Sequence, residues 1–523
     1  MLEAIPEFLY VNQPWYVILI EIWVTFTFIS RLKYFILSKI YKAHSPPRRG
    51  DWFFGFHLLY DMLREGLRGT AQEFTRLNMK KLNVHTAFFK LVGKDIILTH
   101  DPENIKAILA TQFNDFILGS RHECVKITLG DGIFTLDGTG WKHSRAMLRP
   151  QFAREQIGHV ESLEPRVQAL IAQIRKTKGT VFDIQPLFFK LTVDSGTDFL
   201  FGESCDSLNE GLNREMDPSF EGVDSELRRK FPDAFNYSQN ILNIRLNLQK
   251  LYWLGSTLKF KKCNKIVHDF TDFYVKKALG ASEKELETNS RGGYVFLYEL
   301  LKETRDPVVL RDQCLNILLA ARDTTAGLLS FTLFELARNP QIFATLRQNI
   351  VDAFGEGIEA DISLISFETL KKCEYLKWVL NEALRMYPSV PRNFRVSTRN
   401  TTLPRGGGPD QSSPIFVEKG TVVTYAVYST HRDEQFYGED AHVFRPERWG
   451  EPATKKLGWA FLPFNGGPRI CLGQQFALTE ASYVIVRLLQ TFSVVEAFDT
   501  VYPPKLQTHL TMSLKEGANI ALH

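Results

Sequence analysis

The clearest chemical signal in the chain is a cysteine in a glycine-rich loop at residues 464–473, which read FNGGPRICLG. Cys471 follows two glycines, Pro468 and Arg469. Behind it, small or apolar residues recur at helical spacing, at Ala477, Ala481, Val484, Ile485 and Leu488. We therefore expect the cysteine at or just before the N-terminus of a helix. Free backbone N–H groups and the positive end of the helix dipole favour a thiolate there.

The neighbours of Cys471 indicate what a thiolate would face. Gly466, Gly467 and Gly473 leave room for a planar partner, and Arg469 supplies a cation for carboxylates. A haem has a flat face and two carboxylates, and a thiolate ligand makes its iron electron-donating towards dioxygen. Two other interpretations stay open on the loop alone. One is a buried cysteine beside a helix cap, and the other is a cysteine nucleophile, although no partner motif with histidine is evident.

Two charged motifs lie elsewhere in the chain. Glu382 and Arg385 form an ExxR pair on one helix face in NEALRMYP, and Arg448 lies in FRPERW. Trp141 and Arg145 form a WxxxR motif in GWKHSR. Taken singly, these motifs are equally well explained as exposed residues of ordinary helices.

A long apolar segment around residues 315–340 is interrupted by the polar run RDTT at 322–325. Either two helices meet there, with Asp323 or Thr324 as an N-cap, or one helix is bent by threonine hydrogen bonds to the preceding turn. No Pro or Gly precedes the interruption, so one continuous helix is at least as well supported.

Together these motifs resemble the cytochrome P-450 family of haem-thiolate monooxygenases. The loop fits the family's FxxGxRxCxG pattern at Phe464, Gly467, Arg469, Cys471 and Gly473. The resemblance implies haem b as the cofactor, bound by this loop, with Cys471 as the ligand of its iron. It assigns a buried network that supports the loop (Glu382, Arg385 and Arg448) and ligands of the haem carboxylates (Trp141, Arg145, Arg395 and Arg469). For oxygen activation it implies that Thr324 stabilises the oxygen group bound to the iron and that Asp323 relays protons.

The chain departs from the family pattern at two positions. Ala321 stands where glycine is usual, and its methyl group is expected to narrow the groove in which oxygen and water sit. Trp449 stands where phenylalanine is frequent, a change that keeps an aromatic ring. The geometry of proton delivery is therefore less firmly predicted than the cysteine loop.

Within the family, residues 321–340, 384–395, 400–420 and 462–483 look most like the fungal alkane and fatty-acid hydroxylases, which oxidise the terminal carbon of long chains in the endoplasmic reticulum. This likeness implies terminal hydroxylation of an alkane or fatty acid. The alternatives are the same chemistry on a secondary-metabolite intermediate or other lipid and, more distantly, a haem sensor or carrier without turnover.

Candidate substrate-facing segments are rich in aliphatic and aromatic residues, which suits a lipid-like substrate, although each position taken singly is better explained as ordinary core. They are residues 116–134, 246–254, 318–325, 389–394 and 510–512.

The charge balance, the cysteine spacing and the cofactor motifs limit the classes of binding partner that this chain can have. The net charge of +4, from 63 basic and 59 acidic residues, excludes the strongly basic balance of a nucleic-acid binder. Six cysteines with no close pair predict neither a zinc site nor a disulfide scaffold. No flavin or nicotinamide fingerprint occurs in the 523 residues, so we expect electrons from a separate NADPH-cytochrome reductase, with cytochrome b5 as a further candidate partner. Lys142, Arg149, Lys455 and Lys456 are candidates for its docking surface.

The elements that position these residues are mainly helical, with a minor β portion. Helical periodicity covers residues 309–338, 366–387 and 473–490, whereas residues 95–99, 421–428 and 510–514 are typical of strands. Residues 400–414 are expected as a long turn within a sheet. With no second linker or repeat, we expect one large catalytic domain at 51–523.

The N-terminus carries a membrane signal. Residues 15–29 are apolar apart from Glu21, and basic residues follow them, which predicts a transmembrane anchor at 14–30 with residues 1–13 in the lumen. A helix lying in the membrane interface is the alternative, and a cleaved signal peptide is disfavoured. Residues 31–50 are expected as a basic, proline-rich hinge. The chain is thus expected to be a single-pass protein of the endoplasmic reticulum membrane with a cytosolic body.

Overall fold

Helices form most of the computed structural model, which describes residues 14–48, 53–91, 93–153, 160–212, 225–289 and 294–523. The α-helices are α1 Trp15–Ile40, α2 Phe56–Arg68, α3 Ala71–Leu82, α4 Pro102–Lys106, α5 Arg121–Leu129, α6 Gly138–Leu148, α8 Glu164–Lys176, α9 Gln185–Phe201, α10 Ser225–Leu248, α11 Leu258–Gly280, α12 Glu283–Asn289, α13 Phe296–Leu300, α14 Pro307–Arg338, α15 Pro340–Phe354, α16 Phe367–Lys372, α17 Glu374–Met386, α18 Val427–Thr430, α19 Glu434–Tyr437 and α20 Gln474–Thr491. The mainly helical fold expected from the sequence is confirmed.

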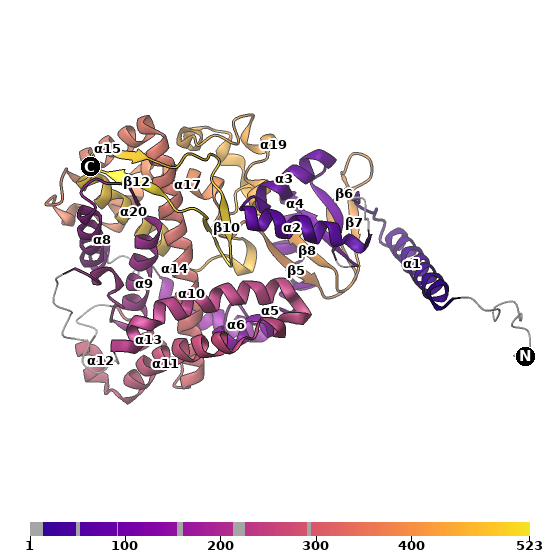
Figure 1. Ribbon diagram of the computed structural model, residues 1–523, viewed down its shortest axis with the longest axis horizontal. Coiled ribbons are helices and arrows are strands. Elements are labelled where there is room, and N and C mark those ends of the chain that lie inside the picture. Colours follow the sequence, from indigo (N-terminus) through magenta and orange to yellow (C-terminus); the bar gives the residue numbers. More distant parts are fainter. Residues whose placement is uncertain (1–13, 49–52, 92, 154–159, 213–224, 290–293) are drawn as a thin grey trace, which may run out of the picture.

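Strands make a smaller part of the described structure. They are β1 Thr86–Leu91, β2 Lys94–Thr99, β3 Phe116–Ile117, β4 Phe182–Asp183, β5 Asn393–Ser397, β6 Thr401–Gly407, β7 Ser413–Val417, β8 Val422–Tyr425, β9 Val495–Ala497, β10 Leu506–Thr508, β11 Met512–Leu514 and β12 Asn519–Leu522. The largest sheet has the order β1–β2–β8–β5–β3 and is antiparallel except between β2 and β8. In Figure 1 this sheet lies with α2, α3 and α4 at the end of the molecule next to α1, while most of the long helices fill the other end.

Two predicted elements are shorter or divided in the structure. The strand expected at 421–428 ends at Tyr425, and α18 turns the chain so that Thr430 donates a hydrogen bond to the carbonyl of His100 at 2.9 Å. The helix expected at 366–387 divides at Cys373, whose ψ of 87° is not helical, into α16 and α17. Residues 400–414 form β6, a turn closed by Gly406 and Gln411, and the start of β7.

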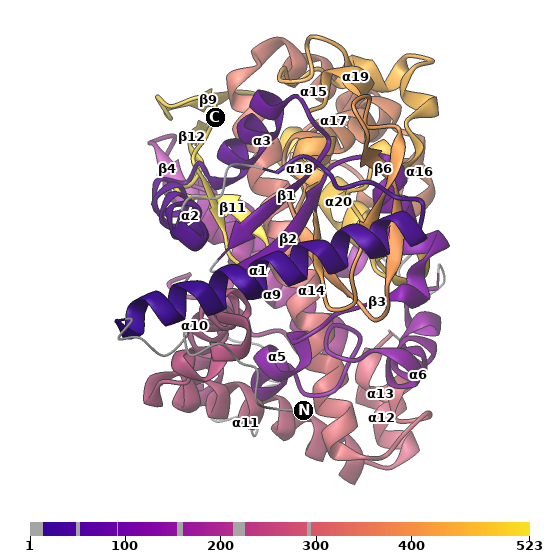
Figure 2. The same ribbon diagram turned by 90° about the vertical axis from the view of Figure 1, so that its right-hand side faces the viewer.

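Helix α14 is the centre of the helical part. Asp306 caps its first turn by accepting from the N–H groups of Val308 and Val309, and Pro307 fits the first helical position. The helix is continuous through the polar interruption, and the Thr324 hydroxyl donates to the carbonyl of Ala320 at 2.7 Å. The alternative of two helices is therefore wrong, and threonine bonding to the preceding turn is observed. Helix α14 packs against α9, α11, α17 and α20, and Figures 1 and 2 both show it running through the middle of the molecule.

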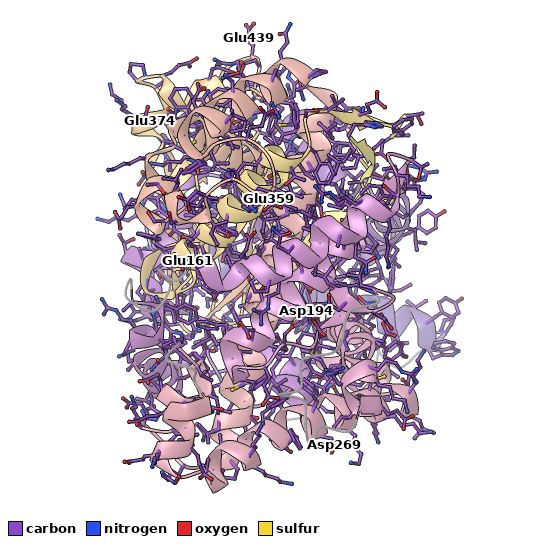
Figure 3. All side chains as sticks on the ribbon, turned by 90° about the vertical axis from the view of Figure 1, so that its left-hand side faces the viewer. Glu161, Asp194, Asp269, Glu359, Glu374 and Glu439 are labelled. Atoms are coloured by element: carbon purple, nitrogen blue, oxygen red, sulfur yellow. The ribbon has the colours of Figure 1, made fainter. Side chains whose placement is uncertain are left out.

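Acidic side chains divide between the surface and this helical core. Figure 3 labels the exposed residues Glu161, Glu359, Glu374 and Glu439 together with Asp194 of α9. Asp194 is buried and accepts from the N–H groups of Ser207 and Leu208 at 2.8 and 2.9 Å. Burial raises its pKa to about 6, and its hydrogen bonds fix the chain that follows α9.

Two helices are long and apolar enough to cross a membrane among the described residues: α1 and α14. Most of the apolar window of α14 is buried in the core, whereas none of that of α1 is, and α1 projects from the body (Figure 1). The candidate membrane anchor is therefore α1, which continues to Ile40, past the end of the predicted span at residue 30.

The region expected as a hinge is joined to the body. Lys33 pairs with Glu418 at 2.6 Å, and the Tyr34 hydroxyl donates to the carbonyl of Phe416 at 2.9 Å. Past the helix, the N–H of His44 donates to the carbonyl of Pro414 at 2.8 Å. The segment is thus helical to Ile40, is bonded to β7 at His44, and is bonded to β1 where the N–H of Phe88 donates to the carbonyl of Pro47 at 2.8 Å. Residues 49–50 of the predicted hinge, and the predicted lumenal residues 1–13, lie outside the described residues.

Candidate active site

The cysteine loop is closed by its own backbone. Gly467–Arg469 form a short 3-10 turn, and the N–H of Cys471 donates to the carbonyl of Phe464 at 3.0 Å. Helix α20 starts three residues after Cys471, with Gly473 at the N-cap position. Cys471 is exposed, whereas the other cysteines of the chain are buried or partly buried. Its sulfur is thus placed before a helix and accessible to a ligand.

The electrostatics of Cys471 differ from the sequence-based expectation. Desolvation of the sulfur by the surrounding protein raises the pKa of the thiol above its ordinary value. The N–H of Gly473 and the charge of Arg145 act in the opposite direction. The helix N-terminus alone therefore does not make a thiolate. A metal cation bound at the sulfur would supply the charge that stabilises the thiolate.

Two of the three loop glycines are in close contact with other parts of the protein, which was not predicted from the sequence. Gly467 has a φ of +65°, and a Cβ there would lie 2.0 Å from the carbonyl oxygen of Leu109, in the π-helical segment η3 Ala107–Thr111. A Cβ on Gly466 would lie 2.5 Å from the Trp459 ring. Gly473 differs, since its nearest neighbour would be Phe152 at 3.6 Å, an ordinary contact. At Gly466 and Gly467 the missing side chain therefore makes room for Trp459 and Leu109 of the protein itself, and the room for a planar ligand against the loop stays a prediction.

Guanidinium groups from separate elements gather beside the loop. Arg469 pairs with Asp137 at 2.7 Å and lies over the buried Trp141 ring, 4.4 Å from its centroid. Arg145 of α6 donates to the carbonyl of Ile470 at 2.9 Å, and Arg395 on β5 is buried. The structure therefore brings together the four residues that were expected to bind the haem carboxylates.

Arg121, at the start of α5, joins this cluster and was not found from the sequence. It donates to Asn393 Oδ1 at 2.6 Å. Burial, together with the like charge of Arg395, lowers the pKa of Arg121 and of Arg469 to about 10. Such an excess of buried positive charge is stabilised by an anionic ligand, and the two carboxylates of a haem fit it. No motif surrounds Arg121 in the sequence, so its only signal is its position in the fold.

Behind the loop, Glu382 is fully buried and receives five hydrogen bonds. Arg385 donates to both of its oxygens at 2.8 and 2.9 Å, and Arg448 donates at 3.0 Å. The N–H of Arg445 and the indole of Trp449 complete the set, each at 3.0 Å. Burial opposes ionisation, but the two guanidinium groups hold the pKa of Glu382 below its ordinary value. The network is thus fully satisfied, as a buried charge requires.

His431 joins this network to the cysteine loop. Its Nδ1 lies 3.1 Å from the carbonyl of Arg385, and its Nε2 accepts from the N–H of Leu462 at 2.8 Å. Burial lowers the pKa of His431 to about 3, so the ring is neutral, with the proton on Nδ1. Neither His431 nor the indole hydrogen bond of Trp449 was predicted from the sequence.

An accessible patch interrupts the buried surface of α14. From Asp312 to Ala337 every residue is buried except Leu319, Ala320, Ala321 and Thr324, which are partly exposed. Thr324 follows Ala320 by four positions and Ala321 by three, so these residues share one helix face, and that face is not fully covered by protein. Asp323, beside the patch, is bonded to Arg322 at 3.1 Å, and burial raises the pKa of its carboxyl.

Two of the candidate substrate-facing segments meet this patch. The Ser389 hydroxyl donates to the carbonyl of Thr324 at 3.5 Å, and the N–H of Met512 donates to the carbonyl of Ser389 at 2.9 Å. A third segment, residues 246–254, ends on the surface instead. There Leu251, Trp253 and Leu254 are each more than half exposed, so that part of the expectation is wrong.

Comparison with known proteins decides the family. The cytochrome P450 family model matches residues 45–521. The chain belongs to the cytochrome P450 family. It is 56% identical to cytochrome P450 52A12 of Debaryomyces hansenii over 97% of both chains, and 56% identical to cytochrome P450 52A9 of Candida maltosa over 100% of this chain and 99% of that one. Cytochrome P450 52A5 of Candida maltosa is 59% identical over 90% of both chains.

Membership of the cytochrome P450 family gives the geometry a chemical meaning. The family consists of haem-thiolate monooxygenases that use redox partners and lipophilic substrates, so this cytochrome P450 is an oxidoreductase with a haem-thiolate cofactor. An accessible cysteine, an arginine cluster and an accessible patch on α14 are the features that such a cofactor requires.

Proposed function

We propose that the protein inserts one oxygen atom of O2 into the terminal C–H bond of a long-chain alkane or fatty acid. The observation that carries this is the partly exposed patch of Leu319, Ala320, Ala321 and Thr324 in the otherwise buried helix α14. Apart from Thr324 it presents only aliphatic side chains, which suits an apolar chain. The likeness of residues 321–340 and 462–483 to fungal alkane and fatty-acid hydroxylases supports the choice of substrate.

The residues around the cysteine loop hold haem b in this proposal. Cys471 is the iron ligand, and Phe464, Gly467 and Gly473 shape the loop that lies against the macrocycle. Trp141, Arg145, Arg395 and Arg469, joined by Arg121, hold the two carboxylates. Haem with a thiolate ligand supplies the oxidising chemistry for an unactivated C–H bond.

Two residues of α14 manage protons beside the patch. The Asp323 carboxyl, whose pKa burial raises, holds a proton more readily than an exposed aspartate does. The Thr324 hydroxyl is oriented by its bond to the carbonyl of Ala320 and can pass a proton into the space that the patch borders. The Ala321 methyl group takes up part of that space and limits the water that reaches it.

Electrons come from a separate NADPH-cytochrome reductase, with cytochrome b5 as a second candidate donor. Lys142, Arg149, Lys455 and Lys456 are all exposed. Lys371 and Lys377 line a surface hollow of about 460 Å³ whose floor includes Phe464 and Ile470 of the cysteine loop. Basic residues around a path to the loop suit an acidic partner protein.

The body faces the cytosol at the endoplasmic reticulum membrane, with α1 as a single span. Helix α2 supports this attachment, because Phe56, Tyr60, Leu63 and Leu67 share one face of it and are exposed. The exposed Trp253 belongs to a second apolar surface, near the end of α10. Both surfaces suit contact with lipid.

The experiment combines microsomes that contain the protein with NADPH, reductase, and a panel of alkanes and fatty acids. We expect oxidation at the terminal carbon. A protein whose reduced carbon-monoxide spectrum shows intact thiolate haem, but which turns over none of the panel, would refute the substrate and leave the family unchanged. In Cys471→Ala the thiolate spectrum should be lost, and its survival would refute the ligand assignment.

A further inference from the structure

A cluster of two histidines and one aspartate lies apart from the cysteine loop, where three segments of the chain meet. His85 precedes β1 and His100 follows β2, next to the antiparallel pair Thr86 and Thr99. The N–H of His100 donates to the carbonyl of His85 at 2.9 Å, which extends the pairing by one residue on each strand. Residues directly opposite each other share one face of a sheet, and the two ring centroids are 4.8 Å apart.

The carboxylate of the cluster comes from the start of α19. Asp433 caps this helix through Oδ1, which accepts from the N–H of Gln435 at 2.9 Å. Its other oxygen, Oδ2, lies 3.4 Å from His85 Nε2 and 3.6 Å from His100 Nε2. Helix α3 packs against α18, which leads into Asp433, so this carboxylate is held on a fixed support.

The distances in the cluster suit a shared cation better than direct bonds. A hydrogen bond between a ring nitrogen and a carboxylate spans about 2.7–3.2 Å. Ligand atoms about 2.0–2.2 Å from a tetrahedral zinc ion are separated by roughly 3.3–3.5 Å. The separations of 3.4 and 3.6 Å lie close to the second range, and all three ligand atoms lie within 4.8 Å of one another.

Two atoms of the cluster are buried without a hydrogen-bond partner: Asp433 Oδ2 and His100 Nδ1. His100 is only 8% exposed. A buried carboxylate oxygen that faces two ring nitrogens without bonding to either is unfavourable unless a cation occupies the space between them.

The charges nearby do not prevent a cation from binding. Arg76 is neutralised by Glu73 at 2.6 Å, and Lys80 by Glu434 at 2.6 Å.

We propose that His85, His100 and Asp433 bind a divalent transition-metal ion, with zinc as the best match. Two imidazoles and one carboxylate exclude magnesium and calcium, which take oxygen ligands, and a water completes the tetrahedron. The ion ties the hairpin of β1 and β2 to the segment of α18 and α19. That segment also carries His431, so the metal stabilises the support of the cysteine loop without touching the haem.

The test uses the full-length holoenzyme, treated with a chelator, then equilibrated with zinc chloride and freed of excess metal. Zinc per haem is measured by inductively coupled plasma mass spectrometry. Asp433→Asn keeps an N-cap acceptor but removes the charge, and His85→Gln changes a side chain that is 37% exposed. His122→Gln is the matched control, because His122 bonds directly to Asp131 at 2.8 Å and is 34% exposed.

Wild type and the His122 variant should each retain one zinc more than the Asp433 and His85 variants. The apparent dissociation constant should rise on the order of 10²-fold in either cluster variant, because a ligand is lost. Zinc should raise the midpoint of thermal unfolding in wild type and the control only. Equal zinc content in wild type and both cluster variants would overturn the proposal and leave a simple histidine–aspartate pair. Loss of the same zinc in the His122 variant would also overturn it.

Discussion

The indole of Trp449 contributes a measurable part of the support for the cysteine loop. Trp449→Phe restores the aromatic ring that is frequent in the family but removes the N–H that donates to Glu382 Oε2 at 3.0 Å. A hydrogen bond to a charged group contributes about 1.5–3 kcal/mol. Because Oε2 keeps the bond from Arg385 Nε at 2.9 Å, we expect a loss near the lower end, about 1.5 kcal/mol.

The assay follows the thiolate signature in the reduced carbon-monoxide spectrum at a fixed urea concentration. A rate suits a large protein better than an equilibrium midpoint. A loss of about 1.5 kcal/mol shortens the half-life of the signature by up to roughly tenfold. The control is Trp378→Phe, since Trp378 lies on α17 with Glu382, is partly buried and packs against Tyr375 at 5.9 Å. Equal half-lives in the two variants would show that the indole bond contributes nothing and would refute this account.

Three further predictions concern protons, charge and pH. Thr324→Val removes the hydroxyl at nearly constant side-chain shape. The amount of product formed per NADPH consumed should fall on the order of 10²-fold while the haem content stays the same. An unchanged amount of product per NADPH would exclude the proton role of Thr324. Arg121→Gln should weaken haem retention by roughly tenfold, measured by the transfer of haem to apomyoglobin. Lys126→Gln, on the same helix, should leave haem retention unchanged. Equal haem retention in the two variants would contradict a contact between Arg121 and the haem carboxylates. The pKa of His431 is about 3 when folded and 6.5 when unfolded, so the unfolded chain binds the extra proton and stability falls as pH drops below 6.5. Between pH 7 and pH 5 this amounts to about 2 kcal/mol. Because the likewise buried His100 contributes a similar loss in both proteins, the loss measured by urea unfolding should be about 2 kcal/mol smaller in His431→Gln than in wild type, and an equal loss would contradict this account.

Much of the fold and the site follows from local patterns. The helix behind Cys471 and the continuous course of α14 were predictable, because apolar spacing and the absence of breakers act over a few turns. The association of Glu382, Arg385 and Arg448 was predictable only through the resemblance, since the residues are far apart in sequence. A buried charged side chain needs hydrogen-bond and charge partners, but its type alone does not reveal which residues the fold brings beside it.

The residues that escaped prediction depend on contacts between distant segments. Gly467 is required by the carbonyl of Leu109, a neighbour that no spacing in the sequence reveals. Arg121 acquires its role because α5 brings it beside Arg395. The pair of His85 and His100 did leave a trace, since His-Thr and Thr-His flank the β1–β2 hairpin symmetrically. That trace needed the register of the strands and the position of Asp433 before it indicated a site.

The joint between α1 and the body determines how the enzyme meets the membrane. A flexible tether would let the body tumble above the lipid surface. Lys33, Tyr34 and His44 instead hold the helix and the chain after it to β7, within the membrane-proximal end of the structure.

In the proposed membrane attachment, anchor and body therefore turn as one piece, and the tilt of α1 in the bilayer sets the orientation of the whole enzyme. In that arrangement the exposed apolar face of α2 stays at a constant depth relative to the membrane surface. A change in bilayer thickness that alters the tilt of α1 would then change the orientation of the body relative to the membrane surface.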